Sequence, residues 1–528
     1  LGYTQAEGCE KFVISNGVLF VGGKALVTHR WLAENKTLSI PNGIAEVRLY
    51  TDYYGLTEDS KFTTLRLSAD LQNLETDRFP VTYYEVEEGS QSFSAQDGVL
   101  FSADGTRLIA YPIENEEMQY IVPDSVTEIG EYAFAYAQKL DRVILGENTQ
   151  TIGEYAFQNA DLINVIYNSA LKTIERYAFF DANLAYVNLP DSLETLEEYA
   201  FYAVSVSTQI RLSAGIGEIK KSVFENASIK SIDIPEGITS VGEDAFACSS
   251  LKEVSLPQSL LSVGENAFRD TLLERVALGK NVQEVGTQAF YNCTSLAEVT
   301  AENSSTEYGD DCFKNTKFLK EGKTATEGAI YLGNTLFSLF GEGESAEVKY
   351  GTTRIFSLES VKVKTLKLPA TLSEIPSVEG LPYLEEIWLG VAPQGAAQTN
   401  VDVGSVRFRA KADHLYIRFP KYVTFSGELG EDVYFCYDGT QAEFEQFAHL
   451  ENAETYADRI YYRDVGSQIN VWDVDEQGRI QLHAADAAFS AGEGSLATLL
   501  SPQTFAAVSA QNLRKTLPYT VRERIWIE

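Results

Sequence analysis

The feature that most constrains this sequence is a short block that recurs every 22–23 residues. The block reads Ile-Gly-Glu-Tyr-Ala-Phe at 129–134, and its echoes end at Phe157, Phe179, Phe201, Phe224, Phe246, Phe268, Phe290 and Phe313. A fixed period of about 20–50 residues is typical of a solenoid, in which successive coils stack on one another. Because a single core stops growing at roughly 250–300 residues, a chain of 528 residues is expected to form several domains or one extended array.

A second block of the form Leu-x-x-Val-x-Leu lies between the phenylalanines, as at Leu251, Val254 and Leu256. Its Val-x-Leu half alternates with period 2, which predicts a short strand. Proline often follows, as at Pro257, and ends the strand because it cannot donate a ladder hydrogen bond. We therefore predict one short strand and a short helical turn per coil, with Phe stacked on Phe and Leu on Leu.

A small or medium residue follows each phenylalanine by three positions, which suits a crowded inward corner. Cys293 belongs to this set, and we interpret it as a core residue. The other cysteines are Cys9, Cys248, Cys312 and Cys436. Their odd total, wide spacing and lack of a CxxC motif argue against a disulfide framework or a zinc site.

The combined pattern resembles the BspA-like (Treponema-type) leucine-rich repeat of bacterial surface proteins. The segment from Ile234 to Gly242, followed by Ala245 and Phe246, carries it, and so does the segment from Ala289 to Leu296. The resemblance implies a β-rich α/β leucine-rich-repeat solenoid on a bacterial cell surface or in the secretome. It also implies a role in adhesion or protein binding without catalysis.

The repeat pattern divides the chain into four parts. Residues 1–120 are irregular repeats with two β-hairpin insertions, and residues 121–313 are the regular array. Residues 314–463 are degenerate repeats with a third hairpin and a terminal coil, and residues 464–528 form a C-terminal cap or small domain. The three hairpins are expected as excursions between coils at Gly17–Phe20, Gly98–Phe101 and Gly328–Tyr331. The segment Tyr437–Phe447 is similar to the family's terminal coil, a turn that leads into an acidic-aromatic helix.

Few residues suggest chemistry. The four histidines have no zinc-ligand spacing, and no GxSxG, P-loop or dinucleotide-binding glycine motif occurs. The segment Asp473–Gly478 starts like a calcium loop, but Ala484 stands where a bidentate Glu is needed, so we predict a hairpin turn. We expect no enzyme, cofactor or metal in the array, while an enzyme confined to residues 464–528 stays open.

The net charge of −34 argues against nucleic acid and anionic membranes as partners. No segment has the ~18–20 consecutive apolar residues of a membrane span, and no leader peptide is visible.

Two exposed columns are candidate sites. The residues flanking each strand valine are expected to line the concave face of the solenoid, where repeat proteins bind their ligands. An apolar group there suggests a protein ligand, unless a hairpin packs on it. The candidates are Arg142, Ile144, Asn164, Ile166, Tyr186, Asn188 and Arg211.

The second column lies two residues before each phenylalanine and begins with four tyrosines, Tyr132, Tyr155, Tyr177 and Tyr199. It is interpreted either as a half-buried structural ladder or as an aromatic surface that binds a glycan. The hairpins are the other candidate site for a glycan. Later coils carry polar residues in both columns.

Overall fold

The computed structural model divides into two units, Leu1–Lys320 and Glu321–Glu528. It describes residues 12–15, 18–21, 24–26, 37–50, 63–77, 80–321, 328–474 and 480–484. Within 328–474 the described residues exclude 359, 376–377, 379–380, 394–395, 397–400, 405–406, 409–414, 431–432, 451–458 and 466–467.

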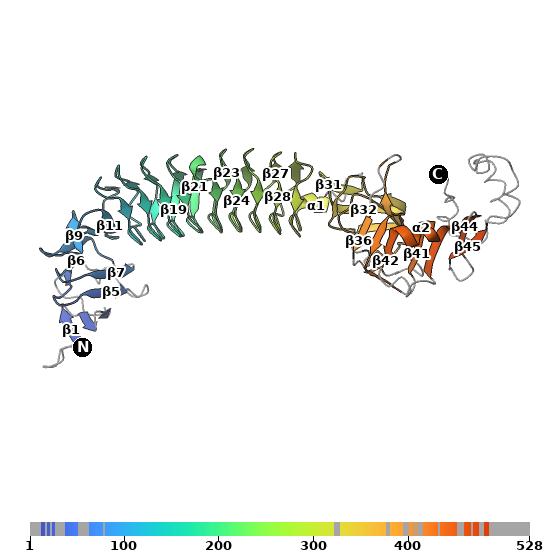
Figure 1. The fold of residues 1–528 in the computed structure, drawn as a ribbon. Coiled ribbons are helices and arrows are strands. Elements are labelled where there is room, and N and C mark those ends of the chain that lie inside the picture. Colours follow the sequence, from blue (N-terminus) through green and yellow to red (C-terminus); the bar gives the residue numbers. More distant parts are fainter. Residues whose placement is uncertain are drawn as a thin grey trace. The chain divides into compact units, whose positions relative to one another are not determined.

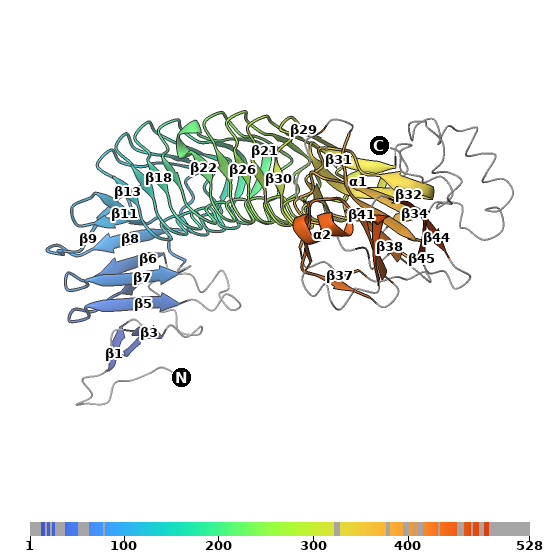
Figure 2. The same cartoon turned by 45° about the vertical axis from the view of Figure 1, so that its right-hand side comes forward.

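Each regular coil contributes two short strands, one more than the single strand expected (Figures 1 and 2). The first is the Val-x-Leu block, as in β14 (Arg142–Ile144), which pairs in parallel with β12 (Gln119–Ile121) and β17 (Asn164–Ile166). The second lies just before the Gly of the Phe block, as in β15 (Thr151–Ile152), which pairs with β13 (Glu128–Ile129) and β18 (Thr173–Ile174). We name these the Val strands and the Gly strands. Two residues are too few to produce a visible alternation, which is why the sequence did not reveal the Gly strands.

The remaining strands of the array continue both series. The Val side continues through β16 (Asp161–Leu162), β19 (Asn183–Asn188), β21 (Ser205–Arg211), β23 (Ser231–Asp233), β25 (Glu253–Ser255), β27 (Arg275–Leu278) and β29 (Glu298–Ala301). The Gly side continues through β20 (Thr195–Leu196), β22 (Glu218–Ile219), β24 (Ser240–Val241), β26 (Ser262–Val263), β28 (Glu284–Val285) and β30 (Glu307–Tyr308). One 3₁₀ turn, Ala214–Ile216, interrupts the array, and α1 (Lys317–Glu321) follows its last coil.

The predicted helical turn takes a different form, a run of three overlapping β-turns. The amides of Ala133, Ala135 and Ala137 donate to the carbonyls three residues earlier, at 3.2, 3.0 and 3.2 Å. The intervening amides point to the neighbouring coil, as when Phe134 N donates to Ala156 O at 2.7 Å. Tyr132 has φ +56° and Tyr136 has φ +61°. A right-handed helix does not contain such left-handed residues, so the segment forms turns that also bind the next coil.

The predicted phenylalanine column is confirmed as the centre of the core. All nine rings are buried, at 1% exposure or less. Successive ring centroids lie 4.7–5.4 Å apart with nearly parallel planes. Cys293 is also fully buried and lies 3.1 Å from Thr271 Oγ1, as expected for a core residue.

The N-terminal hairpins continue the sheets, which corrects the expectation that they are excursions between coils. Strand β10 (Val99–Ser102) pairs antiparallel with β9 (Phe93–Gln96) and β11 (Arg107–Ala110), and β11 pairs in parallel with β13. The hairpin therefore forms the start of the Gly series. Likewise β1 (Phe12–Ser15), β2 (Val18–Val21) and β3 (Lys24–Leu26) lead into β5 (Glu46–Tyr50) and β7 (Asn73–Asp77).

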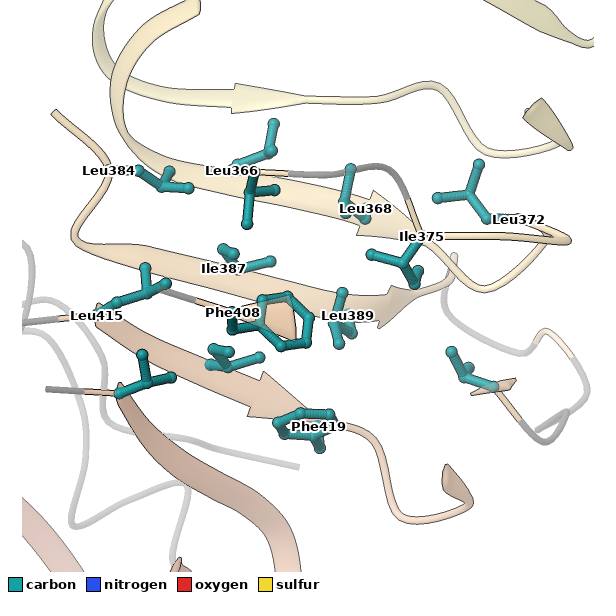
Figure 3. Packing of buried hydrophobic residues seen from close by; sticks show 14 of the residues in the cluster. Leu366, Leu368, Leu372, Ile375, Leu384, Ile387, Leu389, Phe408, Leu415 and Phe419 are labelled. Atoms are coloured by element: carbon teal, nitrogen blue, oxygen red, sulfur yellow. The ribbon is translucent and has the colours of Figure 1, made fainter. Parts of the chain in front are cut away.

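Parallel strands also form on either side of the regular array, within the irregular and degenerate repeats. Leu38 on β4 (Thr37–Ser39) and Leu65 on β6 (Thr64–Leu67) are buried and face each other in a parallel pair. Strand β8 (Tyr83–Val86) pairs in parallel with the other side of β6. In the C-terminal unit, Leu366 on β34 (Ser360–Pro369) pairs with Ile387 on β35 (Glu386–Val391). Figure 3 shows both side chains in the same buried layer as Phe408 and Phe419.

The C-terminal unit is built on one long sheet. The hairpin β31 (Ala329–Leu332) and β32 (Thr335–Glu347) begins it, and here too the third predicted hairpin is part of the sheet. Parallel strands β34, β35, β38 (Leu415–Phe419), β41 (Val433–Thr440) and β43 (Ile460–Val465) follow. The shorter strands are β33 (Arg354–Ile355), β36 (Val401–Gly404), β37 (Arg407–Phe408), β39 (Val423–Phe425), β40 (Glu428–Leu429) and β42 (Ala448–Leu450).

The helix predicted in the terminal coil is confirmed as α2 (Gln441–Phe447), whereas the residues expected to form the turn before it are the end of strand β41. Thr440 and Glu443 form a capping box at its N-terminus. Beyond it, β44 (Gln468–Val474) and β45 (Ile480–Ala484) pair antiparallel and extend the sheet, as the predicted hairpin requires. Cys9 and residues 485–528, which make up most of the cap or small domain expected at 464–528, lie outside the described residues.

Candidate binding surfaces

The Val strands carry an exposed apolar ladder in the first coils of the array. Ile121, Ile144 and Ile166 are direct partners on β12, β14 and β17. Ile121 is 61% exposed and Ile166 is 39% exposed, whereas Ile144 is half-buried.

Three more apolar side chains extend the ladder. Met118 is 63% exposed and Ile163 is 42% exposed. The amide of Asp141 donates to the carbonyl of Met118 at 2.8 Å, and the amide of Ile163 donates to the carbonyl of Asp141 at 2.7 Å. Tyr186, 40% exposed, joins Ile163 through a backbone bond of 3.4 Å. We call these six residues the isoleucine patch. The sequence pattern missed Met118 and Ile121 because their strand lacks the Leu-x-x-Val-x-Leu block.

One predicted site residue does not face solvent. Asn164 is 3% exposed, and its Oδ1 has no hydrogen-bond partner in the described structure. Asn164 and the following Val165 are both buried, so the in-out alternation breaks at this point and turns Asn164 inward. Arg142 is half-buried, which leaves Ile144, Ile166 and Tyr186 as the predicted residues that form the patch.

The polar residues predicted beside the patch form its rim. Asn188 and Arg211 are exposed partners on β19 and β21. The guanidinium of Arg211 donates to Asp191 at 2.9 Å and to Asn188 at 3.4 Å. Further along the same column the residues are polar, as at Asp233 and Ser255, which share a 2.6 Å hydrogen bond. The predicted change from apolar to polar coils is confirmed.

The hairpin that was considered as a cover for this surface pairs elsewhere. Because β11 joins the Gly series through β13, the hairpin leaves Ile121 and Ile166 exposed.

The four predicted tyrosines form a stacked ladder on the turns. The centroids of Tyr132, Tyr155, Tyr177 and Tyr199 follow one another at 5.0, 5.0 and 4.8 Å. Their planes differ by 3°, 0° and 17°. Each residue has a positive φ of 54–61° and is half-buried. The ring faces within the ladder are therefore covered by neighbouring rings, and the ring edges and hydroxyls face outward.

A second aromatic row lies beside the ladder, one residue after the core phenylalanines. Phe180 is 6.3 and 6.0 Å from the centroids of Tyr155 and Tyr177, at 88° and 89° to their planes. Its neighbour Tyr202 is 5.7 Å away. Sequence reasoning missed this row because only two successive coils are aromatic at this position, which gives no periodic signal.

The two aromatic rows line an open depression of about 460 Å³. It is lined by Tyr155, Tyr177, Phe180, Tyr199, Tyr202 and Glu225, which come from four successive coils. We call it the aromatic groove.

The charges around the ladder are mainly acidic. Burial raises the pKa of the Glu131 carboxyl, and the nearby Glu154 raises it further. Burial also raises the pKa of the Tyr155 and Tyr177 hydroxyls, which therefore stay protonated at neutral pH. The guanidinium of Arg176 lies 5.8 and 5.6 Å from the centroids of Tyr177 and Tyr199, and pairs with Glu198 at 3.5 Å.

The described residues contain no group of three or more His, Cys, Asp or Glu side chains placed to hold a metal ion. None of their helices has the length and apolar character needed to cross a membrane.

Comparison with known proteins places the repeat in a family. The model of the BspA type leucine rich repeat region, six copies long, matches residues 114–208, 172–293 and 262–378, which together make half of the chain. No curated protein sequence matches.

Among solved structures, the pneumococcal vaccine antigen PcpA is similar, with 21% identity and a TM-score of 0.27 over 50% of this chain and 62% of that one. The chain thus spans less than two thirds of that relative. A leucine-rich repeat protein from Bacteroides ovatus has 16% identity and a TM-score of 0.37 over 68% of this chain and 90% of its own. A leucine rich cell surface protein from Faecalibacterium prausnitzii has 20% identity and a TM-score of 0.30, over 69% and 99%.

Because the family model matches half of the chain, the chain belongs to the BspA-type leucine-rich-repeat family.

Proposed function

We propose that this chain is a non-catalytic binding protein of a bacterial surface or secretome, and that it recognises a protein ligand through the isoleucine patch. The observation that carries the proposal is the exposed ladder Ile121–Ile144–Ile166 with Met118 at its edge. Contiguous apolar side chains with a polar rim are typical of protein–protein interfaces. The acidic surface of the chain, with a net charge of −34, favours a ligand surface that is neutral or basic around its apolar centre.

The patch could supply the centre of an interface. Burying an isoleucine side chain is worth roughly 1.5–3 kcal/mol, and a few central residues usually dominate the binding energy. An aspartate at one of these positions would lose the free energy of burying the isoleucine side chain. It would also leave a desolvated carboxylate in the interface unless the ligand supplied a partner for it. A loss of at least tenfold in affinity is therefore expected for one substitution at the centre of the contact, since ~1.4 kcal/mol corresponds to tenfold.

The test is a binding assay with the whole chain on immobilised host matrix proteins and bacterial surface proteins. We expect Ile144→Asp and Ile166→Asp each to weaken the interaction at least tenfold. Thr300→Asp is the matched control, because Thr300 is an exposed Val-strand residue in the polar part of the array. Equal binding by the isoleucine variants and the wild type would place the ligand elsewhere. Circular dichroism and the thermal midpoint should match for all variants, because the substituted side chains lie outside the phenylalanine core.

A further inference from the structure

The aromatic groove has a periodicity that suggests one kind of occupant. The tyrosine ladder advances 5.0 Å from Tyr155 to Tyr177 and 4.8 Å from Tyr177 to Tyr199. Two coils therefore advance by nearly the length of one polyproline II turn, which is about 9.3 Å for three residues at ~3.1 Å each. Prolines three residues apart along such a helix would meet equivalent positions of the ladder two coils apart.

The groove also offers the polar groups that an extended peptide backbone needs. A polyproline II segment has no internal hydrogen bonds, so its carbonyls are free to accept. Among the described residues, none forms a hydrogen bond with the hydroxyls of Tyr155, Tyr177 or Tyr199, which face outward from the half-buried rings. Tyr202 differs, because its hydroxyl already accepts from Asn226 Nδ2 at 2.8 Å.

A carboxylate lies at one end of the groove. Glu225 takes the place in the second aromatic row that follows Phe180 and Tyr202, and it lines the depression. No basic side chain of the described structure forms an ion pair with it. A Lys or Arg flanking the proline-rich segment would find this carboxylate at the end of the aromatic rows.

From these features we propose that the aromatic groove binds a proline-rich segment in the polyproline II conformation, with a basic residue next to Glu225. Aromatic-lined grooves recognise such segments because the peptide is already extended and loses little conformational entropy on binding. The site is separate from the isoleucine patch, since it is formed by the turns and not by the Val strands.

A glycan is the competing occupant. Sugars stack on open ring faces, but within the ladder the faces of Tyr155 and Tyr177 are covered by neighbouring rings at 5.0 Å. Only ring edges, hydroxyls and the second aromatic row remain for contact. This arrangement favours the ridged surface of a proline-rich peptide over a flat sugar.

The experiment uses the whole chain and fluorescently labelled peptides in a polarisation assay. One peptide carries Arg followed by two prolines three residues apart, a second has both prolines replaced by alanine, and a third has Arg replaced by Gln. Linear oligosaccharides are titrated in parallel by isothermal calorimetry. The protein variants are Phe180→Ala, Tyr202→Ala and Glu225→Gln. Tyr291→Ala is the control, since Tyr291 occupies the same position as Tyr202 four coils further on, outside the tyrosine ladder.

We expect saturable binding of the proline peptide, at least tenfold weaker binding of the alanine peptide, and a tenfold loss for Phe180→Ala and Tyr202→Ala. Glu225→Gln should weaken the Arg peptide about threefold and leave the Gln peptide unchanged, while Tyr291→Ala binds like the wild type. Equal affinity for the proline and alanine peptides would overturn the proposal. Binding that is unchanged by both aromatic substitutions, in variants that are folded, would also overturn it. So would a groove that binds an oligosaccharide but does not bind the proline peptide.

Discussion

The recurring glycine of the Phe block offers a quantitative test of how closely the coils approach. Gly264 N donates to Val241 O at 2.7 Å across the coil boundary. A methyl group on Gly264 would lie 2.8 Å from the carbonyl carbon of Gly242, 2.9 Å from Glu243 N and 2.9 Å from Val241 O. All three contacts are backbone atoms of the neighbouring coil, so they cannot rotate away. We predict that Gly264→Ala forces the two coils apart and destabilises the N-terminal unit.

The required movement is small, which bounds the expected cost. Two coils carry a glutamate at the equivalent position, Glu175 and Glu197, and there the bond to the neighbouring coil is 2.9 Å. This bond is 0.2 Å longer than the one at Gly264, so a side chain at this position requires only a small separation of the coils. Overpacking of this kind costs roughly 1–3 kcal/mol, while replacing Gly lowers the entropy of the unfolded chain and returns ~0.4–1 kcal/mol. The net loss is about 1–2 kcal/mol, which lowers the melting temperature by roughly 2–8 °C.

Gly279→Ala is the matched control. The three atoms nearest to a methyl group there are all in the side chain of Gln258, the closest at 3.3 Å, and that residue is exposed, so its side chain can turn away. We expect an unchanged or slightly higher midpoint in thermal unfolding followed by circular dichroism. Because repeat arrays need not unfold in two states, native-state hydrogen exchange of the coils around residue 264 should confirm the local loss. If both variants melt together, at the wild-type temperature or above it, the inferred backbone contact is wrong.

Three further predictions concern the core, the cysteines and the terminal coil. Phe201→Ala should destabilise the array by about 3–5 kcal/mol in denaturant unfolding, because the ring is fully buried between rings at 4.7 and 5.4 Å. Burial raises the pKa of the Cys293 thiol to about 11 and that of Cys436 to about 12. Cys248 is exposed, so alkylation of the native protein at pH 8 should modify it before Cys293 and Cys436, as peptide mass spectrometry would show; rapid labelling of Cys293 would contradict its core position. Hydrogen bonds from Lys421 and from the Thr440 amide lower the pKa of the Glu443 carboxyl in the folded state. Ionised Glu443 therefore stabilises the folded state at pH values above the pKa of this carboxyl in the unfolded chain, and this stabilisation is lost as the pH falls. Amide exchange in α2 should accordingly accelerate below pH ~4.3 in the wild type and show no such acceleration in Glu443→Gln.

The core of this fold could be predicted from the sequence because its side chains repeat in every coil. Phenylalanine recurs nine times at one position, and stacking requires the same shape in each coil. The turn conformation left a weaker trace. The two left-handed positions beside each core ring are often Asn or Asp, as at Asn159 and Asp244. These residue types tolerate positive φ, so their recurrence could have indicated turns in place of a helix. Tyrosines at the same positions in earlier coils obscured that signal.

The surfaces were predicted less completely, because nothing requires exposed columns to repeat. Ile144, Ile166 and Tyr186 followed from strand alternation, whereas Asn164 depended on a local break in that alternation. Phe180 and Tyr202 form their row only through their spatial relation to the tyrosine ladder. A pattern of period 22–23 identifies what the coils share, and these residues are what distinguishes one coil from another.

Backbone conformation does not favour the tyrosine ladder. A side chain in the left-handed region costs roughly 1–2 kcal/mol per residue, and less for Asn or Asp. The four tyrosines sit at φ +54° to +61°, where later coils place Asp244 and Asn266. Three stacked pairs at ~0.5–1.5 kcal/mol each offset part of this cost, so stacking does not make tyrosine clearly more stable here than asparagine. Stability alone therefore does not explain the choice of tyrosine, and conflicts between local preference and fold are expected where a protein performs its function. The ladder borders the aromatic groove, and the isoleucine patch lies on the same early coils, which supports binding roles for both surfaces in this part of the array.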